Sequence, residues 1–480
     1  MIHAYSVKDV RAAEAAMPEL ATGELMQRAS QGVAEVAAAR LEEQGGSSVV
    51  VLAGPGGNGG DALFAASFLA PDYDVVAILT GSGAHEPALQ AAHDAGVVVL
   101  EPDSPTALSA LDEADLVIDG MTGIGGRPGL PPGTSKLVDA IGDDAYLLAV
   151  DLPSGADPAG EVASDCVYAD ETVTFSLPKP VHLLPSTEAA CGLLTVVDIG
   201  LTPPASPAVS RLTFADVAAL WPVPGPDDDK YTRGVLGVVS GGEHYTGAAI
   251  LGVTAAVTVG VGMVRYVGPP APTGLLRAAV PEVVFGEGKV QAWLIGSGMD
   301  WDDASEEQKR VIGDALASDL PVVVDAGGLD ALIEPRKAHT LITPHAGELL
   351  RLGRRVLDED LPDSWVTDAP VAAARKIADA LDVAVLLKGS VTIVVPPTAT
   401  GLGIHSQSDG PAWLATAGSG DVLAGICGAL LASGVPPLGA GALAALVHGV
   451  AAHDVNPGGP IRALDIAHQV GRTVGRLLTR

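Results

Sequence analysis

Short, continuous apolar runs alternate with Ala-rich stretches along the chain, and this alternation restricts the possible folds more than any other feature. Runs without polar alternation are typical of strands buried on both faces of a parallel sheet. The stretches between them, and residues 10–44, have helical spacing. The sequence therefore predicts an α/β protein with open parallel sheets. In the first half the runs are Ser48–Ala53, Val75–Thr80, Val97–Leu100, Leu116–Asp119 and Leu147–Val150.

A chain of 480 residues is too long for one ordinary core and should divide into domains. The best linker lies in residues 201–229, where prolines cluster at both ends, and the boundary is expected near residues 203–212. We predict domains over residues 1–208 and 209–480. The second half repeats the pattern of a run that ends in a loop bearing Gly, His or Thr, at Val235–Ser240, Trp293–Ile295, Val322–Asp325, Leu341–Ile342 and Val383–Leu387.

The formal net charge of −31 argues against nucleic acid and anionic membranes as partners. The acidic excess is spread along the chain, as on a halophilic-type protein whose self-repulsion is weakened by salt. The count of three cysteines is odd, which argues against a framework of disulfide bonds. The first residues lack the apolar segment of a secretory signal peptide. No apolar run reaches membrane-spanning length without Gly, Pro or polar breaks. We expect a cytoplasmic protein, and the sequence leaves a homo-oligomer open.

Polar residues follow several strands of the first half. The glycine-rich stretch GPGGNGGD, residues 54–61, joins a strand to a helix, an arrangement that cradles phosphates. Asp119 and Asp151 each close a strand and should meet Asp61 at one sheet edge. With Asn58 and Ser154 these acids could bind a cation, or they could supply a general acid and base. The simpler alternative is a glycine turn in which Asp61 caps the helix.

In the second half, a Gly-Ser-Gly-Asp segment opens an apolar helix after residue 417. Gly418 and Gly420 let a ligand approach the backbone, and a helix N-terminus binds anions such as phosphate. Asp421 would then be a carboxylate beside a phosphate, a costly placement unless it handles a proton or a metal. The alternative is a turn with an N-capping Asp.

The motifs GPGGNGGD, DGMTGIGGRPG, VDLPSG and FSLPKP resemble, in order and spacing, the NAD(P)H-hydrate epimerase domain, which has a Rossmann-like fold. The resemblance implies a potassium ion held by Asn58, Asp119 and Ser154, although another monovalent cation could take its place. Gly57 departs from the family, which usually has Asn there. Lys179 matches a family lysine, but it is expected to be solvated or structural. The implied contacts to the hydrate are Gly57, Asn58, Gly59, Gly60, Asp61, Gly123, Ile124, Gly125, Gly126, Arg127, Pro128, Gly129 and Asp151, with Asp119 and Asp151 as catalytic candidates.

From about Lys230 the motifs YTGAA, DAGGLDAL, TPHAGE, LLKGS and AGSGDVLAG resemble the NAD(P)H-hydrate dehydratase domain, which has the ribokinase-like fold. The resemblance implies that Asp421 takes a hydroxyl proton and that ADP or ATP, with magnesium, is the co-substrate. Gly327, Gly328, Asp330 and Gly296 depart from the family pattern. The implied hydrate contacts are Ala248, Gly298, His345 and Asp421, and the implied nucleotide contacts are Lys388, Gly389, Ser390, Val391, Thr392 and Gly420.

Three side chains also have plainer interpretations. His345 could be a hydrogen-bonded structural residue of a loop. His448 and His453 lie in a small-residue helix, where packing is the better interpretation. Trp413 could stack on a ring or simply pack.

The whole pattern predicts one enzyme with two repair activities. The first domain would interconvert the R and S hydrates NADHX and NADPHX, and the second would dehydrate the S form at the expense of ADP or ATP. One alternative is a ribokinase-like small-molecule kinase with a non-catalytic, nucleotide-binding N-domain. Another is a binding protein that has lost catalysis.

Overall fold

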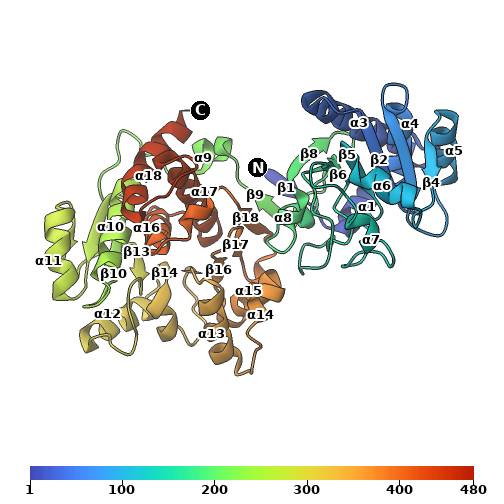
Figure 1. Cartoon of the computed structure of the whole chain (residues 1–480). Coiled ribbons are helices and arrows are strands. Elements are labelled where there is room, and N and C mark those ends of the chain that lie inside the picture. Colours follow the sequence, from blue (N-terminus) through green and yellow to red (C-terminus); the bar gives the residue numbers. More distant parts are fainter. Residues whose placement is uncertain (480) are drawn as a thin grey trace. The chain divides into compact units, whose positions relative to one another are not determined.

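The computed structural model describes residues 1–479, which fold as two compact units. The N-terminal unit comprises His3–Val209, and the C-terminal unit comprises Ser210 onward together with Met1–Ile2. Two short strands, β1 (Ile2–Ala4) and β9 (Val209–Arg211), lie at the division. Figure 1 colours both units along the chain. Each unit is an α/β fold, as the alternation of apolar runs predicts.

The N-terminal unit is built on a parallel seven-stranded sheet in the order β4–β3–β2–β5–β6–β7–β8. Side chains of β2 alternate between two cores, with Val49 and Val51 on one face and Val50 and Leu52 on the other. The five predicted runs all form strands. The strands are β2 (Ser48–Ala53), β3 (Asp74–Leu79), β4 (Val98–Leu100), β5 (Leu116–Gly120), β6 (Tyr146–Val150), β7 (Glu171–Phe175) and β8 (Leu193–Val197).

The helical structure predicted over residues 10–44 is confirmed, but it is divided among three helices. Pro18 precedes the second helix, and Gly23, with φ of +79°, separates it from the third. The left-handed backbone at Gly23 ends one helix and lets the next begin in a new direction. The helices of this unit are α1 (Val7–Ala15), α2 (Glu19–Thr22), α3 (Glu24–Gln44), α4 (Gly57–Leu69), α5 (Glu86–Asp94), α6 (Pro105–Asp112), α7 (Ser135–Val138), α8 (Glu188–Cys191) and the 3-10 turn η1 (Pro180–His182).

In the C-terminal unit, neighbouring strands run in the order β18–β17–β16–β15–β14–β13–β10–β11–β12. Those from β16 through β12 pair in parallel, and β17 and β18 add an antiparallel margin. All five runs predicted for this half form strands. The strands are β10 (Val235–Val239), β11 (Met263–Tyr266), β12 (Val284–Phe285), β13 (Ala292–Ile295), β14 (Val322–Val324), β15 (Thr340–Ile342), β16 (Ala384–Leu387), β17 (Thr392–Val395) and β18 (Ile404–Gln407).

The largest core of this unit packs the helix that follows the Gly-Ser-Gly-Asp segment, α16, among other helices and the sheet. The helix α17 is long and apolar enough to cross a membrane, but most of it is buried in this core, as in a core helix. The helices are α9 (Phe214–Leu220), α10 (Thr246–Thr258), α11 (Pro270–Ala279), α12 (Glu306–Ala317), α13 (Ala346–Leu357), α14 (Trp365–Asp368), α15 (Pro370–Leu381), α16 (Ser419–Ala432), α17 (Pro437–Val455) and α18 (Ala463–Leu478), with 3-10 turns η2 (Ala326–Ala331), η3 (Thr398–Thr400) and η4 (Ala412–Leu414).

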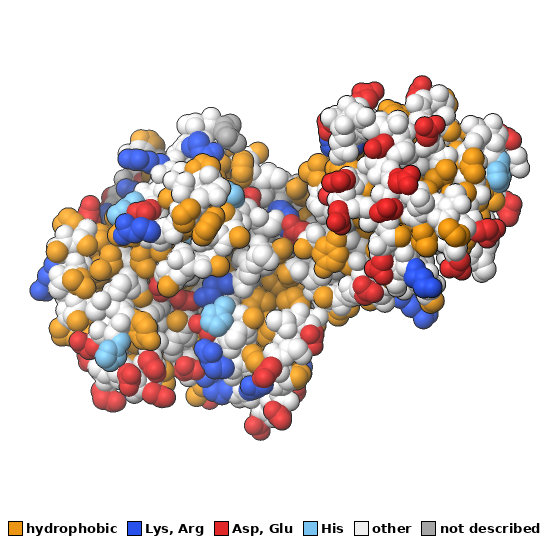
Figure 2. Space-filling model, viewed as in Figure 1, with side chains coloured by type: hydrophobic (Ala, Val, Ile, Leu, Met, Phe, Trp, Pro, Cys, Tyr) orange, Lys and Arg blue, Asp and Glu red, His pale blue; other side chains and the backbone are white. Residues whose placement is uncertain are grey.

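Acidic side chains are distributed over the visible face of each unit and are not gathered into one patch (Figure 2). Basic side chains are fewer, in keeping with 27 Lys and Arg against 58 Asp and Glu.

Candidate functional sites

The first candidate site is a cavity of about 790 Å³ in the N-terminal unit, at the ends of β2, β5 and β6. The start of α4, the loop after β5 and the residue after β6 all contribute to its lining. Ligands of open α/β sheets bind at this edge. Of the residues predicted for this site, Gly57, Asn58, Asp61, Gly123, Ile124, Gly125, Gly126 and Asp151 line the cavity, whereas Gly59, Gly60, Asp119, Arg127, Pro128, Gly129 and Ser154 are not among the lining residues.

The side chain of Asn58 connects three strand-end loops. Its Nδ2 donates to the carbonyl of Thr122, at 2.8 Å, and to that of Val150. Gly123 makes room for this arrangement, since a Cβ there would lie 2.3 Å from Asn58 Oδ1. The predicted glycine and asparagine motifs therefore meet in one hydrogen-bonded unit.

Behind the cavity, Asp119 and Ser154 bind each other. Asp119 is fully buried and accepts bonds from the Ser154 hydroxyl at 2.6 Å, the Ser154 N–H at 2.7 Å and the Met121 N–H. Burial raises the pKa of the Asp119 carboxyl, although these bonds oppose the shift. All three donor groups are neutral, so the carboxyl has no cationic partner among the hydrogen bonds and ion pairs of residues 1–479.

Sequence reasoning left Lys179 out of the site, and its interpretation as a solvated residue is wrong. Lys179 is 1% exposed, and its ammonium forms an ion pair with Asp151. The partners are 28 residues apart and meet because β6 and β7 are neighbours in the sheet. The one signal in the sequence was that FSLPKP ends a strand-like run and so places a lysine at the same sheet edge as Asp151.

The second candidate site surrounds the start of α16 in the C-terminal unit. The helix begins at Ser419, and Gly418 before it has φ of +90°, a left-handed conformation that favours glycine. The first N–H groups of a helix lack intrahelical partners and attract anions. A Cβ at Gly420 would lie 3.4 Å from Lys388 Nζ, which places the lysine beside this turn.

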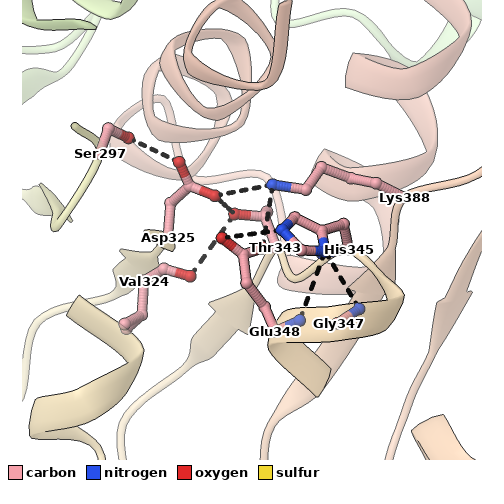
Figure 3. A network of polar contacts seen from close by, with 8 residues as sticks. All are labelled: Ser297, Val324, Asp325, Thr343, His345, Gly347, Glu348 and Lys388. Carbon is pink, nitrogen blue, oxygen red and sulfur yellow. Dashed lines mark hydrogen bonds and ion pairs between the residues drawn. The ribbon is translucent and has the colours of Figure 1, made fainter. Parts of the chain in front are cut away.

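Lys388 belongs to a polar network drawn from four strand-end loops (Figure 3). Its Nζ lies 3.1 Å from Asp325 Oδ1 and 3.6 Å from Glu348 Oε2. Asp325 also accepts bonds from the hydroxyls of Ser297 and Thr343, both at 2.9 Å. Burial acts to lower the pKa of Lys388, but the two carboxylates overcome this and raise it, so the side chain is a fixed cation. The sequence singled out Lys388 but gave Glu348 no role.

The carboxyl of Asp421 lies in the electrostatic field of this network. Burial raises its pKa to about 7, Asp325 and Glu348 add to the increase, and Lys388 opposes it. A carboxyl that titrates near neutral pH is matched to general base catalysis at that pH. The Gly-Ser-Gly-Asp segment at the start of α16 therefore contains a carboxyl whose raised pKa suits it to proton transfer.

His345 is the N-cap of α13. Its Nδ1 accepts bonds from the N–H groups of Gly347 and Glu348, so the ring proton is on Nε2. The side chain is 56% exposed and lines a cavity of about 780 Å³. His345 is therefore a hydrogen-bonded loop residue, as its structural interpretation predicts. Its ring also lines the cavity of about 780 Å³.

The same cavity of about 780 Å³ collects most of the predicted nucleotide contacts, namely Lys388, Gly389, Ser390, Thr392 and Gly420, whereas Val391 is buried outside its lining. His448, expected to pack, is buried and also lines the cavity. Trp413 is half exposed, and its indole N–H donates to the carbonyl of Gly458. Ala248 and Gly298, which are predicted to contact the hydrate, lie next to each other. A Cβ at Gly298 would lie 2.1 Å from the Cβ of Ala248.

The departures from the family pattern have structural counterparts. Asp330 forms an ion pair with Arg355, which neutralises the additional charge. Gly296 has φ of +98°, and a Cβ there would lie 2.5 Å from Gly328 Cα. The two glycines thus let their loops touch at the backbone.

Comparison with known proteins covers both units. The family described as YjeF-related protein N-terminus matches residues 22–181, and the family described as NAD(P)H-hydrate dehydratase matches residues 236–464. A Mycobacterium tuberculosis protein named bifunctional NAD(P)H-hydrate repair enzyme Nnr is 42% identical over 91% of this chain and 90% of its own. The protein of that name from Mycobacterium leprae is 41% identical over 100% of this chain and 99% of its own length.

A crystal structure of the ADP/ATP-dependent NAD(P)H-hydrate dehydratase from Bacillus subtilis, co-crystallised with ATP and Mg²⁺, covers 56% of this chain and 99% of its own. Its TM-score is 0.50 at 23% identity, a likeness that concerns the fold alone.

Proposed function

The chain belongs to the family of bifunctional NAD(P)H-hydrate repair enzymes, and on that premise we propose which residues perform each activity. It is an enzyme that epimerises the R and S hydrates of NADH and NADPH and dehydrates the S form. We assign epimerisation to residues 1–208 and dehydration to residues 209–480. The small-molecule kinase alternative is not favoured, because relatives with both domains match along the whole chain.

In the dehydratase half, Asp421 is the general base. The observation that carries this proposal is its near-neutral pKa at the N-terminus of α16. Asp421 takes the proton of the hydrate's ring hydroxyl as that oxygen attacks the terminal phosphorus of ADP or ATP. The N–H groups of Ser419 and Gly420 stabilise the charge on the transferred phosphoryl group. Phosphate then leaves with the C–O electron pair, and loss of a proton from the neighbouring carbon restores the double bond.

The nucleotide is assigned to the cavity of about 780 Å³, where Lys388 and Gly420 are adjacent. Lys388 places a fixed positive charge beside the phosphates, with Asp325 holding its ammonium. No cluster of three His, Cys, Asp or Glu side chains suited to a metal occurs among residues 1–479. Magnesium is assigned to the nucleotide phosphates, where it would neutralise charge when bound.

In the epimerase half, the hydrate is assigned to the cavity of about 790 Å³, against Asn58, residues 123–126 and Asp151. Potassium, or another monovalent cation, is assigned to Asn58, Asp119 and Ser154. Their carboxylate, hydroxyl and amide groups are oxygen donors that suit a hard cation. A buried Asp119 whose bonded partners are all neutral is compatible with a positive ion.

The test supplies a mixture of R and S hydrates of NADH with ADP and magnesium and follows the absorbance of reduced nicotinamide. Wild-type protein should restore the whole mixture, and Asp421→Asn should restore none beyond the spontaneous rate. Recovery of only the S fraction would refute the epimerase assignment. No recovery with ADP or ATP would reject the dehydratase assignment.

A further inference from the structure

Lys179 is almost fully buried behind the epimerase cavity, and its ion-pair partner Asp151 lines that cavity. Its ammonium contacts Asp151 Oδ1 and donates to Thr174 Oγ1 at 2.7 Å, and the Thr174 hydroxyl donates to the same Asp151 oxygen at 3.1 Å. A buried ammonium is retained only where an anionic partner such as a carboxylate compensates it. Both bonds are made to Oδ1, so Oδ2 of Asp151 stays available to a ligand in the cavity that this residue lines.

The backbone of Asp151 is held equally firmly. Its φ is +66°, which is rare for a residue with a side chain, and His182 Nε2 lies 2.9 Å from its carbonyl oxygen. His182 Nδ1 accepts the N–H of Lys179, so the ring proton is on Nε2 and is donated to Asp151. The lysine and the histidine of one loop thus fix both the side chain and the backbone of this carboxylate.

Across the cavity, Asp61 has a different environment. Its one hydrogen-bonded neighbour among residues 1–479 is the hydroxyl of Ser30, at 3.3 Å, and the same hydroxyl donates to the Met26 carbonyl at 2.8 Å. A hydroxyl has one proton to donate. Because the Met26 carbonyl is only an acceptor and takes the shorter bond, the Ser30 oxygen can accept from Asp61. The contact is therefore satisfied when the Asp61 carboxyl carries a proton.

We propose that Asp61 and Asp151 form a divided acid–base pair in the epimerase half, with Asp61 as the proton donor and Lys179 as the positioning residue that pairs with Asp151. The proposal rests on the epimerase assignment of this unit. Burial and the Asp151 charge hold the pKa of Asp61 well above its usual value. Two carboxyls with opposed environments are a recurring way to divide acid and base roles.

The chemistry follows from the hydrate itself, in which the hydroxyl is on the ring carbon beside the ring nitrogen. Asp61 protonates this hydroxyl, the C–O bond breaks with its electron pair on oxygen, and water leaves. The nitrogen lone pair forms a C=N double bond, and the planar cation lies beside the Asp151 carboxylate. Water adds to the opposite face and gives its proton to the Asp151 carboxylate, and proton exchange with solvent then restores the proton on Asp61 and the charge on Asp151. The cycle is balanced and needs no further reactant.

Other charged groups of this cavity come from α1. Glu14 and Arg11 both line it, and Arg11 donates to the Ile124 carbonyl. Burial, with a contribution from Asp151, raises the pKa of Glu14, while Lys179 and Arg11 oppose the shift. Glu14→Gln is the comparison variant, because it removes a carboxyl that lines the same cavity and contributes to the raised pKa of Asp61 only through its charge, as the smallest of the causes.

The first experiment compares Asp61→Asn with Glu14→Gln in the full-length chain. Asp61→Asn should lower the rate of R-to-S conversion by about 10²–10⁴-fold, and Glu14→Gln should change it by less than about tenfold. Dehydration of the S hydrate by the other half of the same chain should be unchanged, which excludes misfolding. A wild type that cannot epimerise would refute the proposed function. A wild type that epimerises alongside an equally fast Asp61→Asn variant would overturn only this inference.

Solvent labelled with ¹⁸O tests the order of bond breaking. Departure and return of water place solvent oxygen in the ring hydroxyl of every inverted molecule. Inversion that retains the original oxygen would mean that the ring opens at the C–N bond, and it would overturn the proposal.

Lys179 is tested through its partner. If it acts only through its ion pair with Asp151, Lys179→Met should cost nothing further in an Asp151→Asn background, although each change alone slows epimerisation. The double variant also removes both buried charges, so it avoids the unpaired carboxylate that could prevent folding of Lys179→Met. Losses that multiply in the double variant would show that Lys179 acts independently of Asp151.

Discussion

Lys388 Nζ lies 3.1 Å from Asp325 Oδ1, and through this contact one ammonium group is fixed beside the Asp421 carboxyl. Because Asp325 raises the pKa of Asp421 and Lys388 lowers it, the pair tunes the proposed general base. The same ammonium adjoins Gly420 at the turn assigned to phosphate. Base strength and phosphate recognition therefore depend on one ion pair.

Removing the positive charge of Lys388 should move the pH profile of dehydration. In Lys388→Met the pKa of Asp421 rises above about 7, since the group that lowers it is gone. The acid limb of kcat/KM for the S hydrate, measured at saturating ADP, should shift to higher pH. Lys388→Arg keeps the charge and should shift the limb less. An unchanged limb in Lys388→Met would contradict the coupling.

Asp421→Asn should abolish dehydration while sparing the other activity. Loss of the general base should lower the dehydration rate by about 10²–10⁴-fold. Epimerisation by the N-terminal unit should continue at the wild-type rate, measured by chromatographic separation of the two epimers. Equal loss of both activities would indicate a global defect and not a catalytic one.

The same substitution should stabilise the protein at alkaline pH. The pKa of Asp421 is about 7 in the folded state, against 3.8 ordinarily, so the fold favours the protonated carboxyl. Ionisation therefore reduces the free energy of unfolding as pH rises through this window, and the full reduction is present above pH about 7. Relative to wild type, Asp421→Asn should gain on the order of 1 kcal/mol or more at alkaline pH and little at acid pH. Thermal unfolding at both pH values checks this, and an equal gain at both would contradict it.

Gly123→Ala should disrupt the loop junction of the N-terminal unit. The new Cβ would lie 2.3 Å from Asn58 Oδ1, so the asparagine must abandon its bonds to Thr122 and Val150. We expect a loss of about 1–3 kcal/mol in stability and a strong loss of epimerisation. Gly57→Ala is the matched control for the loss of stability, because nothing lies within 4 Å of a Cβ there. Similar effects of the two substitutions would refute the role of the contact.

The net charge of −31 predicts that thermal stability rises with salt, because screening weakens self-repulsion. Potassium and sodium chloride should act alike through screening. A response to potassium alone at low concentration would instead report the ion assigned to Asn58, Asp119 and Ser154, and Ser154→Ala should abolish that response. Full stability without added salt would refute the halophilic-type interpretation.

Much of the fold could be predicted, because its signals are local. A buried parallel strand such as Ser48–Ala53 shows its continuous apolar run directly, and the Gly-Ser-Gly-Asp segment marks the start of α16. The break in the helix predicted over residues 10–44 was missed, because Ala-rich periodicity outweighed Pro18 and Gly23. The strands β17 and β18 were also missed: β18, with the sequence IHSQ, has no apolar run, whereas the TIVV run of β17 was overlooked.

The sequence by itself determined the two α/β halves, the order of their glycine-rich loops and the acids that close their strands, since each is a pattern among neighbouring residues. Only the tertiary structure decided that Lys179 is the partner of Asp151, that Lys388 joins Asp325 to Glu348, and that Asp421 titrates near neutral pH. Those properties depend on which strands are adjacent and on how much water each carboxyl loses. Residues 28 and 63 positions apart meet only when the sheet forms.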